Sequence, residues 1–181
     1  QTCEKSTINN KNMLFIWKQF LSDTHLPGII FHEDFIEKIK IKLNYDLDEK
    51  MFLNITSVRI PVVASFLDFW KKNIEEDTEE PEIEIGEIAC FFKKWSENNF
   101  NGVEECYLLD LIKHFYNEVN IKDDKYLIHI KYKNWDRRQI IYDCIDLYKH
   151  TMNTNNKYCS SLTHAYTYYL SYEKDKLAIS K

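Results

Sequence analysis

The sequence predicts a mainly α-helical protein with a small β component, an α+β class. Three observations favour this class. Apolar residues recur at helical spacing in several separate stretches. The stretch 126–132 alternates between apolar and polar residues, which is typical of a strand. Hydrophobic residues make up 44% and aromatic residues 15% of the 181 residues, so the chain can bury a core.

The predicted organisation is a helical N-terminal unit at 13–74, an acidic linker at 75–82 and a winged-helix-like unit at 83–150. A helical tail follows at 158–181, and we expect this tail to be truncated. Six of the eight linker residues are acidic and repel one another, and Pro81 prevents a helix from continuing. We therefore expect a flexible connection there.

Three helices are expected in the N-terminal unit. The first spans 13–21 and ends before the Pro27-Gly28 break, and the second spans about 33–43. The third begins near Thr56 or Ser57 with Pro61 in its first turn. Residues 44–55 fit a short strand or an extended connection. The expected inward residues are Leu14, Trp17, Phe20 and Leu21, then Phe35, Ile36, Ile39 and Leu43, then Val63, Phe66, Leu67 and Trp70.

The winged-helix-like unit begins with a short strand around Ile83 and Ile85. Two helices follow, separated by a turn at Gly102. A turn at Asp123-Asp124 then leads into the alternating strand. The helices are marked by Ile88, Phe91, Phe92 and Trp95 and by Leu108, Leu111, Ile112 and Phe115; the strand places Tyr126, Ile128, Ile130 and Tyr132 opposite His129 and Lys131.

Two further helices are expected towards the C-terminus. One runs from 136 to about 150, and a tyrosine-rich one spans 162–172 after a polar loop at 151–157. The apolar residues 177–179 fit the start of a strand. The first of these helices is expected to bury Ile140, Ile141, Cys144 and Leu147.

Several kinds of chemistry are missing from the sequence. The three glycines stand apart, so no glycine-rich turn can hold a phosphate. The five cysteines form no CxxC pair and are interpreted as buried, reduced thiols, and the histidines lack metal-ligand spacing. Cys159, Ser160 and Ser161 lack the glycines of a nucleophile elbow. We therefore expect no catalytic residues, no cofactor and no metal, and enzymatic activity would belong to a longer protein.

The location of the protein is expected to be intracellular, in the host cytoplasm or nucleus if the source is viral. The sequence has no signal peptide, and no apolar run reaches the roughly 20 residues that span a bilayer. No membrane partner is expected.

One basic cluster is the candidate binding site. The net charge is −5, but residues 121–181 carry a positive balance and the first 120 residues a negative one. The cluster consists of Lys131, Lys133, Trp135, Arg137 and Arg138. Basic groups beside an aromatic residue at the end of a ribbon suit contact with a phosphate backbone. The alternative interpretation is that Trp135 anchors a core and the charges solvate the start of a helix.

The chain also resembles a known family. The residues Phe66-Leu67-Asp68-Phe69-Trp70, an acidic spacer, Ile85-Gly86-Glu87-Ile88 and Phe91-Phe92-Lys93-Lys94-Trp95 are similar to the C-terminal winged-helix region of poxvirus-type primase-helicases of large DNA viruses. The resemblance implies a winged-helix domain whose first helix ends in an aromatic–x–x–Trp pattern. It implies that the ribbon 126–132 is the wing. The motor and primase motifs of the family are absent from this chain.

The second helix of the unit differs from a DNA-reading helix in its charge. Around 103–118 its only cationic side chain is Lys113, beside Glu104, Glu105, Asp110 and Glu118. Such a helix is a poor fit to a DNA groove. We therefore expect any nucleic-acid contact to come from the ribbon and the basic cluster.

Two functions follow as hypotheses. The first is a non-catalytic module of a viral replication protein that binds or positions DNA or RNA through its backbone. The second is a protein–protein interaction or self-assembly module that uses exposed aromatic residues and the acidic linker, with other replication proteins or a second copy as partner. A stand-alone enzyme ranks third.

Overall fold

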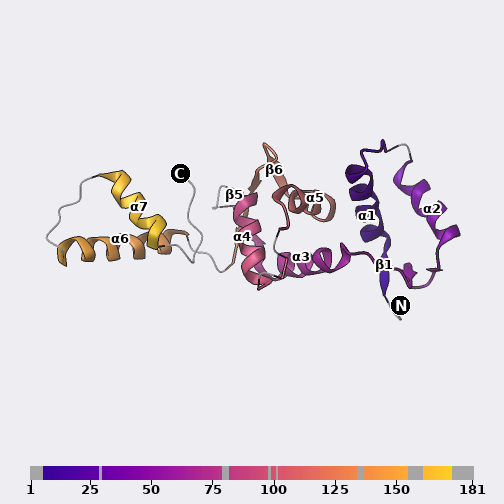
Figure 1. The fold of residues 1–181 in the computed structure, drawn as a ribbon, viewed down its shortest axis with the longest axis horizontal. Coiled ribbons are helices and arrows are strands. Elements are labelled where there is room, and N and C mark those ends of the chain that lie inside the picture. The colour runs from indigo at the N-terminus through magenta and orange to yellow at the C-terminus, as the bar shows by residue number, and fades with distance from the viewer. Residues whose placement is uncertain are drawn as a thin grey trace.

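The computed structural model describes residues 6–28, 30–78, 82–97, 99–100, 102–133, 137–154 and 161–172. Over these residues the protein is mainly α-helical with small β-sheets, which confirms the predicted fold class (Figure 1). The elements are β1 (Thr7–Asn9), α1 (Asn10–Asp23), α2 (His32–Lys42), β2 (Tyr45–Asp46), β3 (Met51–Leu53), α3 (Ile60–Asn73), β4 (Ile74–Glu76), β5 (Glu82–Glu84), α4 (Ile85–Trp95), α5 (Glu105–Phe115), β6 (Asn120–Lys122), β7 (Tyr126–Ile128), β8 (Ile130–Tyr132), α6 (Arg137–Thr154) and α7 (Leu162–Tyr172).

The main hydrophobic core lies between α3, α4 and α5. The aromatic rings of Phe66 and Phe69 on α3 pack against Phe92 on α4, with centroids 5.3 and 5.5 Å apart. Leu111 and Ile112 of α5 and Leu127 of β7 are fully buried in the same cluster. The predicted amphipathic faces of these helices supply the core, and Phe69, which was not among the expected inward residues, is fully buried with them.

A smaller core is formed by the N-terminal elements. The strands β1, β3 and β2 form an antiparallel sheet in that order, and the cluster around it contains Ile8, Phe35 and Phe52. Trp17 of α1 stacks on Phe35 of α2 with centroids 4.4 Å apart.

The helix α1 contacts both cores, and this corrects its predicted inward face. Met13 is buried in the smaller core, whereas Phe15, which is only 1% exposed, belongs to the main core. Phe20 was expected to point inward but is 46% exposed. The single-stripe prediction was wrong because two different surfaces cover this helix.

The winged-helix-like order of elements is present from β5 onward. The strand β5 precedes α4 and α5, and the hairpin of β6 and β7 follows them. The three strands form an antiparallel sheet in the order β5-β7-β6. The β-hairpin that fits a wing is therefore 120–128, with its turn at Asp123-Asp124, and not the stretch 126–132.

The alternating stretch is divided at His129. This residue has a φ of 59°, in the left-handed region, so β7 and β8 belong to different sheets. Leu127 is fully buried and Ile130 is 4% exposed, whereas Ile128 is half-buried. One continuous face over 126–132 was a wrong prediction, because the turn at His129 shifts the alternation.

The acidic linker is also corrected. Its first residues form β4, which pairs with β8, and its last residue begins β5, which pairs with β7. The helix α3 before the linker shares the main core with α4 and α5 behind it. The hydrophobic core therefore crosses the boundary that the sequence placed at 75–82.

The last two described helices, α6 and α7, lie side by side at one end of the molecule in Figure 1. The helix α7 has the predicted bounds, but α6 continues to Thr154, beyond the predicted start of a loop at 151. Cys144, Tyr148 and Tyr169 are buried between them. Ile141 (38% exposed) and Leu147 (41% exposed) are not buried as predicted, because α7 covers only part of the apolar stripe. The predicted strand at 177–179 lies outside the described residues.

None of the helices in the described ranges combines the length and the apolar character that a membrane crossing requires.

Candidate functional site

Lys131 of the predicted basic cluster is held by carboxylates. Its ammonium lies 2.6 Å from Asp77 and 3.4 Å from Glu75, both from the former linker. Hydrogen bonding to Asp77 raises the pKa of Lys131, and Glu75 adds to this effect. The charge of Lys131 is thus largely balanced within the chain, and the residue fastens β8 to β4.

Lys133 occupies a different environment. Its backbone N–H donates to the carbonyl of Asn73 (2.8 Å), and its exposed ammonium donates to the carbonyl of Lys72 (3.1 Å). Because β8 runs antiparallel to β4, the residue after β8 returns to the C-terminus of α3. Lys133 therefore lies beside Lys72 at the end of α3, and both Lys72 and the preceding Lys71 are exposed. We call Lys71, Lys72 and Lys133 the basic edge.

The residues of the basic edge differ in how far their charge is engaged. Lys72 forms an ion pair with Asp68 (2.8 Å), one helical turn earlier, and lies 6.0 Å from the centre of the Trp95 ring. Lys71 is exposed beside it in the last turn of α3, where a cation is favourable for the helix dipole. Sequence analysis missed Lys71 and Lys72, because only the strand pairing brings them to Lys133.

The remaining residues of the predicted cluster are Trp135, Arg137 and Arg138. Trp135 lies outside the described residues. Arg137 and Arg138 form the start of α6 by their backbone, four and five positions after Lys133. In the sequence, the two adjacent arginines thus follow Lys133 closely.

The helix α5, which the sequence analysis compared with a DNA-reading helix, is covered by α1. Phe15 of α1 packs against the rings of Tyr107, His114 and Phe115, with centroids 5.4–5.6 Å apart. Gln19 donates to the Asp110 carboxylate (2.9 Å) in a partly buried hydrogen bond. These contacts occupy the face of α5 that turns towards the N-terminal unit.

His114 of α5 makes two polar interactions with α1. Its Nε2 lies 2.9 Å from the carbonyl of Lys11, and its Nδ1 lies 3.3 Å from the ammonium of Lys18. The neutral tautomer that fits donates from Nε2–H and accepts at Nδ1. Burial lowers the pKa of His114, although the carbonyl of Lys11 opposes this effect.

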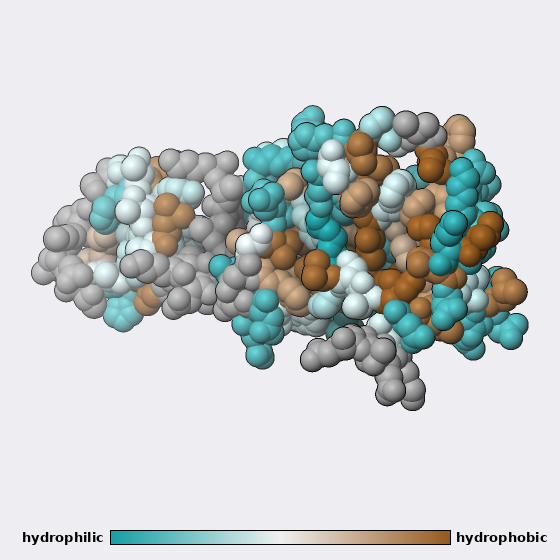
Figure 2. Space-filling model, turned by 45° about the vertical axis from the view of Figure 1, so that its right-hand side comes forward, coloured by the Kyte–Doolittle hydropathy of each residue, from teal (hydrophilic) through white to brown (hydrophobic). Residues whose placement is uncertain are grey.

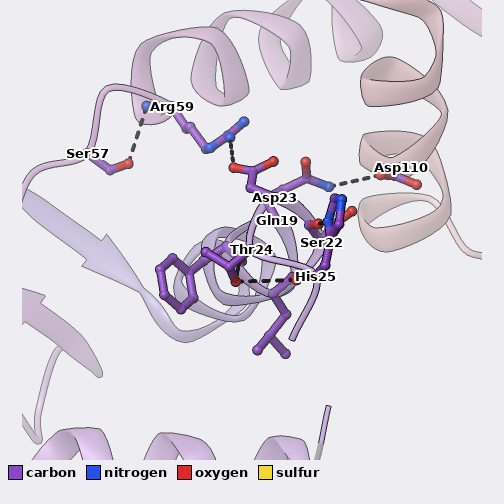
Figure 3. A network of polar contacts seen from close by, with 10 residues as sticks. Gln19, Ser22, Asp23, Thr24, His25, Ser57, Arg59 and Asp110 are labelled. Atoms are coloured by element: carbon purple, nitrogen blue, oxygen red, sulfur yellow. Dashed lines mark hydrogen bonds and ion pairs between the residues drawn. The ribbon is translucent and has the colours of Figure 1, made fainter. Parts of the chain in front are cut away.

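Beside this contact lies a groove with a volume of about 560 Å³, between the end of α1, the start of α3 and the start of α5. Figure 3 shows its polar network: Arg59 forms an ion pair with Asp23, Ser57 accepts from the backbone N–H of Arg59, and Gln19 reaches Asp110. Burial raises the pKa of Tyr107, which lines the groove, and the neighbouring Arg59 offsets part of this rise. The Arg59–Asp23 ion pair and the Gln19–Asp110 hydrogen bond thus connect α1 with the start of α3 and with α5.

Within the described ranges, no three His, Cys, Asp or Glu side chains gather as metal ligands would. The cysteines correct one expectation: Cys144 is buried, but Cys90 and Cys106 are exposed. Cys90 was expected to be buried, but the buried face of α4 is formed by Ile88, Phe91 and Phe92.

Apolar side chains also reach the surface. Figure 2 shows them interspersed with polar residues over the larger part of the molecule. Phe31 and Ile41 are each 82% exposed at the two ends of α2. On the last two helices, Ile145 and Leu162 are 41% and 87% exposed.

Comparison with known proteins identifies no relative: no protein-family model, curated protein or solved structure matches the chain.

Proposed function

We propose that this chain is a non-catalytic module that binds or positions nucleic acid through its phosphate backbone, using the basic edge together with Arg137 and Arg138. One observation carries the proposal. The hydrogen bond from Lys133 to the Lys72 carbonyl joins two basic stretches that are 61 residues apart in the sequence. A surface with several exposed cations is what backbone contact requires.

The residues of this surface have different roles in the proposal. Lys71 and Lys133 present exposed ammonium groups, and Arg137 and Arg138 add guanidinium groups, which suit phosphate oxygens. Lys131 has two carboxylate partners, so it positions the ribbon. Trp135 lies between Lys133 and the arginines in the sequence, and we propose for it the role expected there, a packing or stacking anchor.

The wider setting rests on the sequence resemblance. We propose that the module belongs to a viral replication protein of the primase-helicase kind, in which motor activity would lie elsewhere in a longer chain. An intracellular location is proposed with it.

The test is a titration of a dye-labelled DNA duplex followed by fluorescence anisotropy. Four phosphate contacts, from Lys71, Lys133, Arg137 and Arg138, predict that affinity falls about a hundredfold between roughly 50 and 200 mM salt. The double variant Arg137→Glu with Arg138→Glu should abolish binding, because two contacts become repulsive.

The matched control is Lys38→Glu with Lys42→Glu, which changes the net charge equally on α2, away from the basic edge (Figure 1). This variant should bind nearly as well as the unaltered protein. Absence of binding at about 50 mM salt, or an equal loss in the control, would contradict the proposal.

Protein–protein interaction or self-assembly is the second candidate, and the exposed apolar residues of α6 and α7 favour it. If copies associate through them, light scattering should give a mass above 21.9 kDa that Ile141→Ser with Ile145→Ser returns to the monomer. Ile41→Ser on α2 is the control, which should leave the mass unchanged. A monomeric mass for the unaltered protein at high concentration would reject self-assembly.

A further inference from the structure

We propose that the ligand of the basic edge is a nucleic-acid duplex, held by its backbone and bound without reading its base sequence. This inference rests on the proposed function and names the class of nucleic acid that the site takes. It follows from what the structure does with the two elements that read bases in winged-helix modules, the second helix and the wing, and from the chemistry of the basic edge.

The second helix cannot enter a groove while α1 covers it. A recognition helix reads base edges by lying in the major groove with its side chains free. On α5, Phe15 of α1 packs on the rings of Tyr107, His114 and Phe115, and Phe15 itself is only 1% exposed. The contact is a part of the main core.

The exposed charge of α5 leads to the same conclusion. Glu105 and Asp110 are exposed on this helix, and they would repel phosphate. Its lysine, Lys113, forms an ion pair with Asp124 at the tip of the β6–β7 hairpin (2.7 Å). Lys113 is the lysine of α5, and its charge is balanced by a carboxylate. The described residues of α5 therefore present no unpaired lysine to a duplex.

The wing is equally unsuited to a base-reading role. Its tip consists of the exposed residues Asp123 and Asp124, whose backbone φ angles of 54° and 51° form the tight turn. The following Lys125 is paired with Glu84 on the neighbouring strand (2.9 Å). An acidic tip does not enter a minor groove, whose potential is negative.

The basic edge itself has the chemistry of backbone contact. Its described members are lysines, which act on phosphate as point charges, and phosphate contacts carry no direct sequence information. These lysines lie just after β8 and at the C-terminus of α3. They therefore belong neither to α5 nor to the wing.

The described aromatic rings beside the basic edge favour a duplex over a single strand. Proteins that bind single strands stack bases on accessible aromatic rings. Here the Trp95 ring packs against Phe69 (5.8 Å) and lies under Lys72, and the Tyr132 ring stacks on Phe91 with centroids 4.1 Å apart. Both rings are used within the fold. A duplex, with one charge per roughly 1.7 Å of its axis, offers the lysines the higher phosphate density.

The first experiment measures the affinity of the full chain for two duplexes of equal length and unrelated sequence, and for one of their single strands. We expect equal affinities and equal salt slopes for the two duplexes, and weaker binding of the single strand. A clear preference for one duplex, or tighter binding of the single strand, would overturn this inference while leaving the proposed function intact. Binding to none of the three would reject the proposed function itself.

The second experiment locates the contact with two matched variants, Lys133→Gln and Lys113→Gln. Each removes one positive charge from an exposed side chain, so both variants change the net charge of the protein equally. Lys133→Gln should weaken binding to every duplex about eightfold near 0.1 M salt and reduce the salt slope by about one. Lys113→Gln should leave affinity unchanged. A larger loss from Lys113→Gln would show that α5 contacts the nucleic acid and would overturn the inference.

Discussion

At the scale of single residues, His114 is the most informative side chain. It lies half-buried between α1 and α5, with Lys11 and Lys18 of α1 around its two ring nitrogens. A proton on Nδ1 would remove the acceptor for Lys18 and place a third positive charge among the lysines. The neutral imidazole is therefore part of the contact that keeps α1 on α5.

This arrangement predicts a pH dependence of stability. Burial lowers the pKa of His114 in the folded chain below its ordinary value near 6.5, so the unfolded chain binds the extra proton more readily. The free energy of unfolding should therefore fall as pH drops from about 6.5 towards the lowered pKa, and level off below it. Urea unfolding across this range measures the effect.

The control for this prediction is His114→Gln, in which the amide can keep the hydrogen bond to the Lys11 carbonyl but does not titrate. Its free energy of unfolding should vary less with pH over the same window than that of the unaltered protein. If the two proteins show the same pH dependence, the dependence comes from other groups.

At the scale of elements, prediction from sequence worked where an apolar stripe was long and faced one partner. The helices α3, α4 and α5 were found through Phe66, Phe92 and Leu111, which are all buried. The strands β1, β4 and β6 were missed because each has three residues with a single apolar one among them, too few to show alternation. The acidic residues of 75–82 suggested repulsion, but their pairing with Lys131 depends on a strand that lies far along the chain.

One element also carries a cap that periodicity did not reveal. Glu84 and Glu87 form a capping box at the start of α4, and the Glu87 carboxylate accepts from the backbone N–H of Glu84 (2.9 Å). Because unpaired N–H groups at a helix start cost free energy, Glu87→Ala should lower the free energy of unfolding by about 1 kcal/mol.

The matched control for this prediction is Glu97→Ala, which removes an exposed carboxylate beyond the end of the same helix. It should change stability by less than about 0.5 kcal/mol. Chemical denaturation of both variants provides the comparison, and equal effects would mean that the cap contributes nothing specific.

At the scale of the whole molecule, the candidate site illustrates why only part of it could be predicted. Lys133 was found because it stands in a local basic cluster with Arg137 and Arg138. Lys71 and Lys72 became part of the surface only through the pairing of β4 with β8. The covering of α5 by α1 depends on contacts between residues about ninety positions apart, which no local pattern reveals.

The double role of α1 also sets an order of events during protein synthesis. The smaller core is complete once β3 has left the ribosome, so Met13 can be buried early. Phe15 on the same helix has to wait for α5, because the Gln19–Asp110 contact beside it spans 91 residues. Between the synthesis of β3 and that of α5, a nascent chain whose smaller core has formed would expose Phe15, and exposed apolar surface of this kind is what chaperones bind.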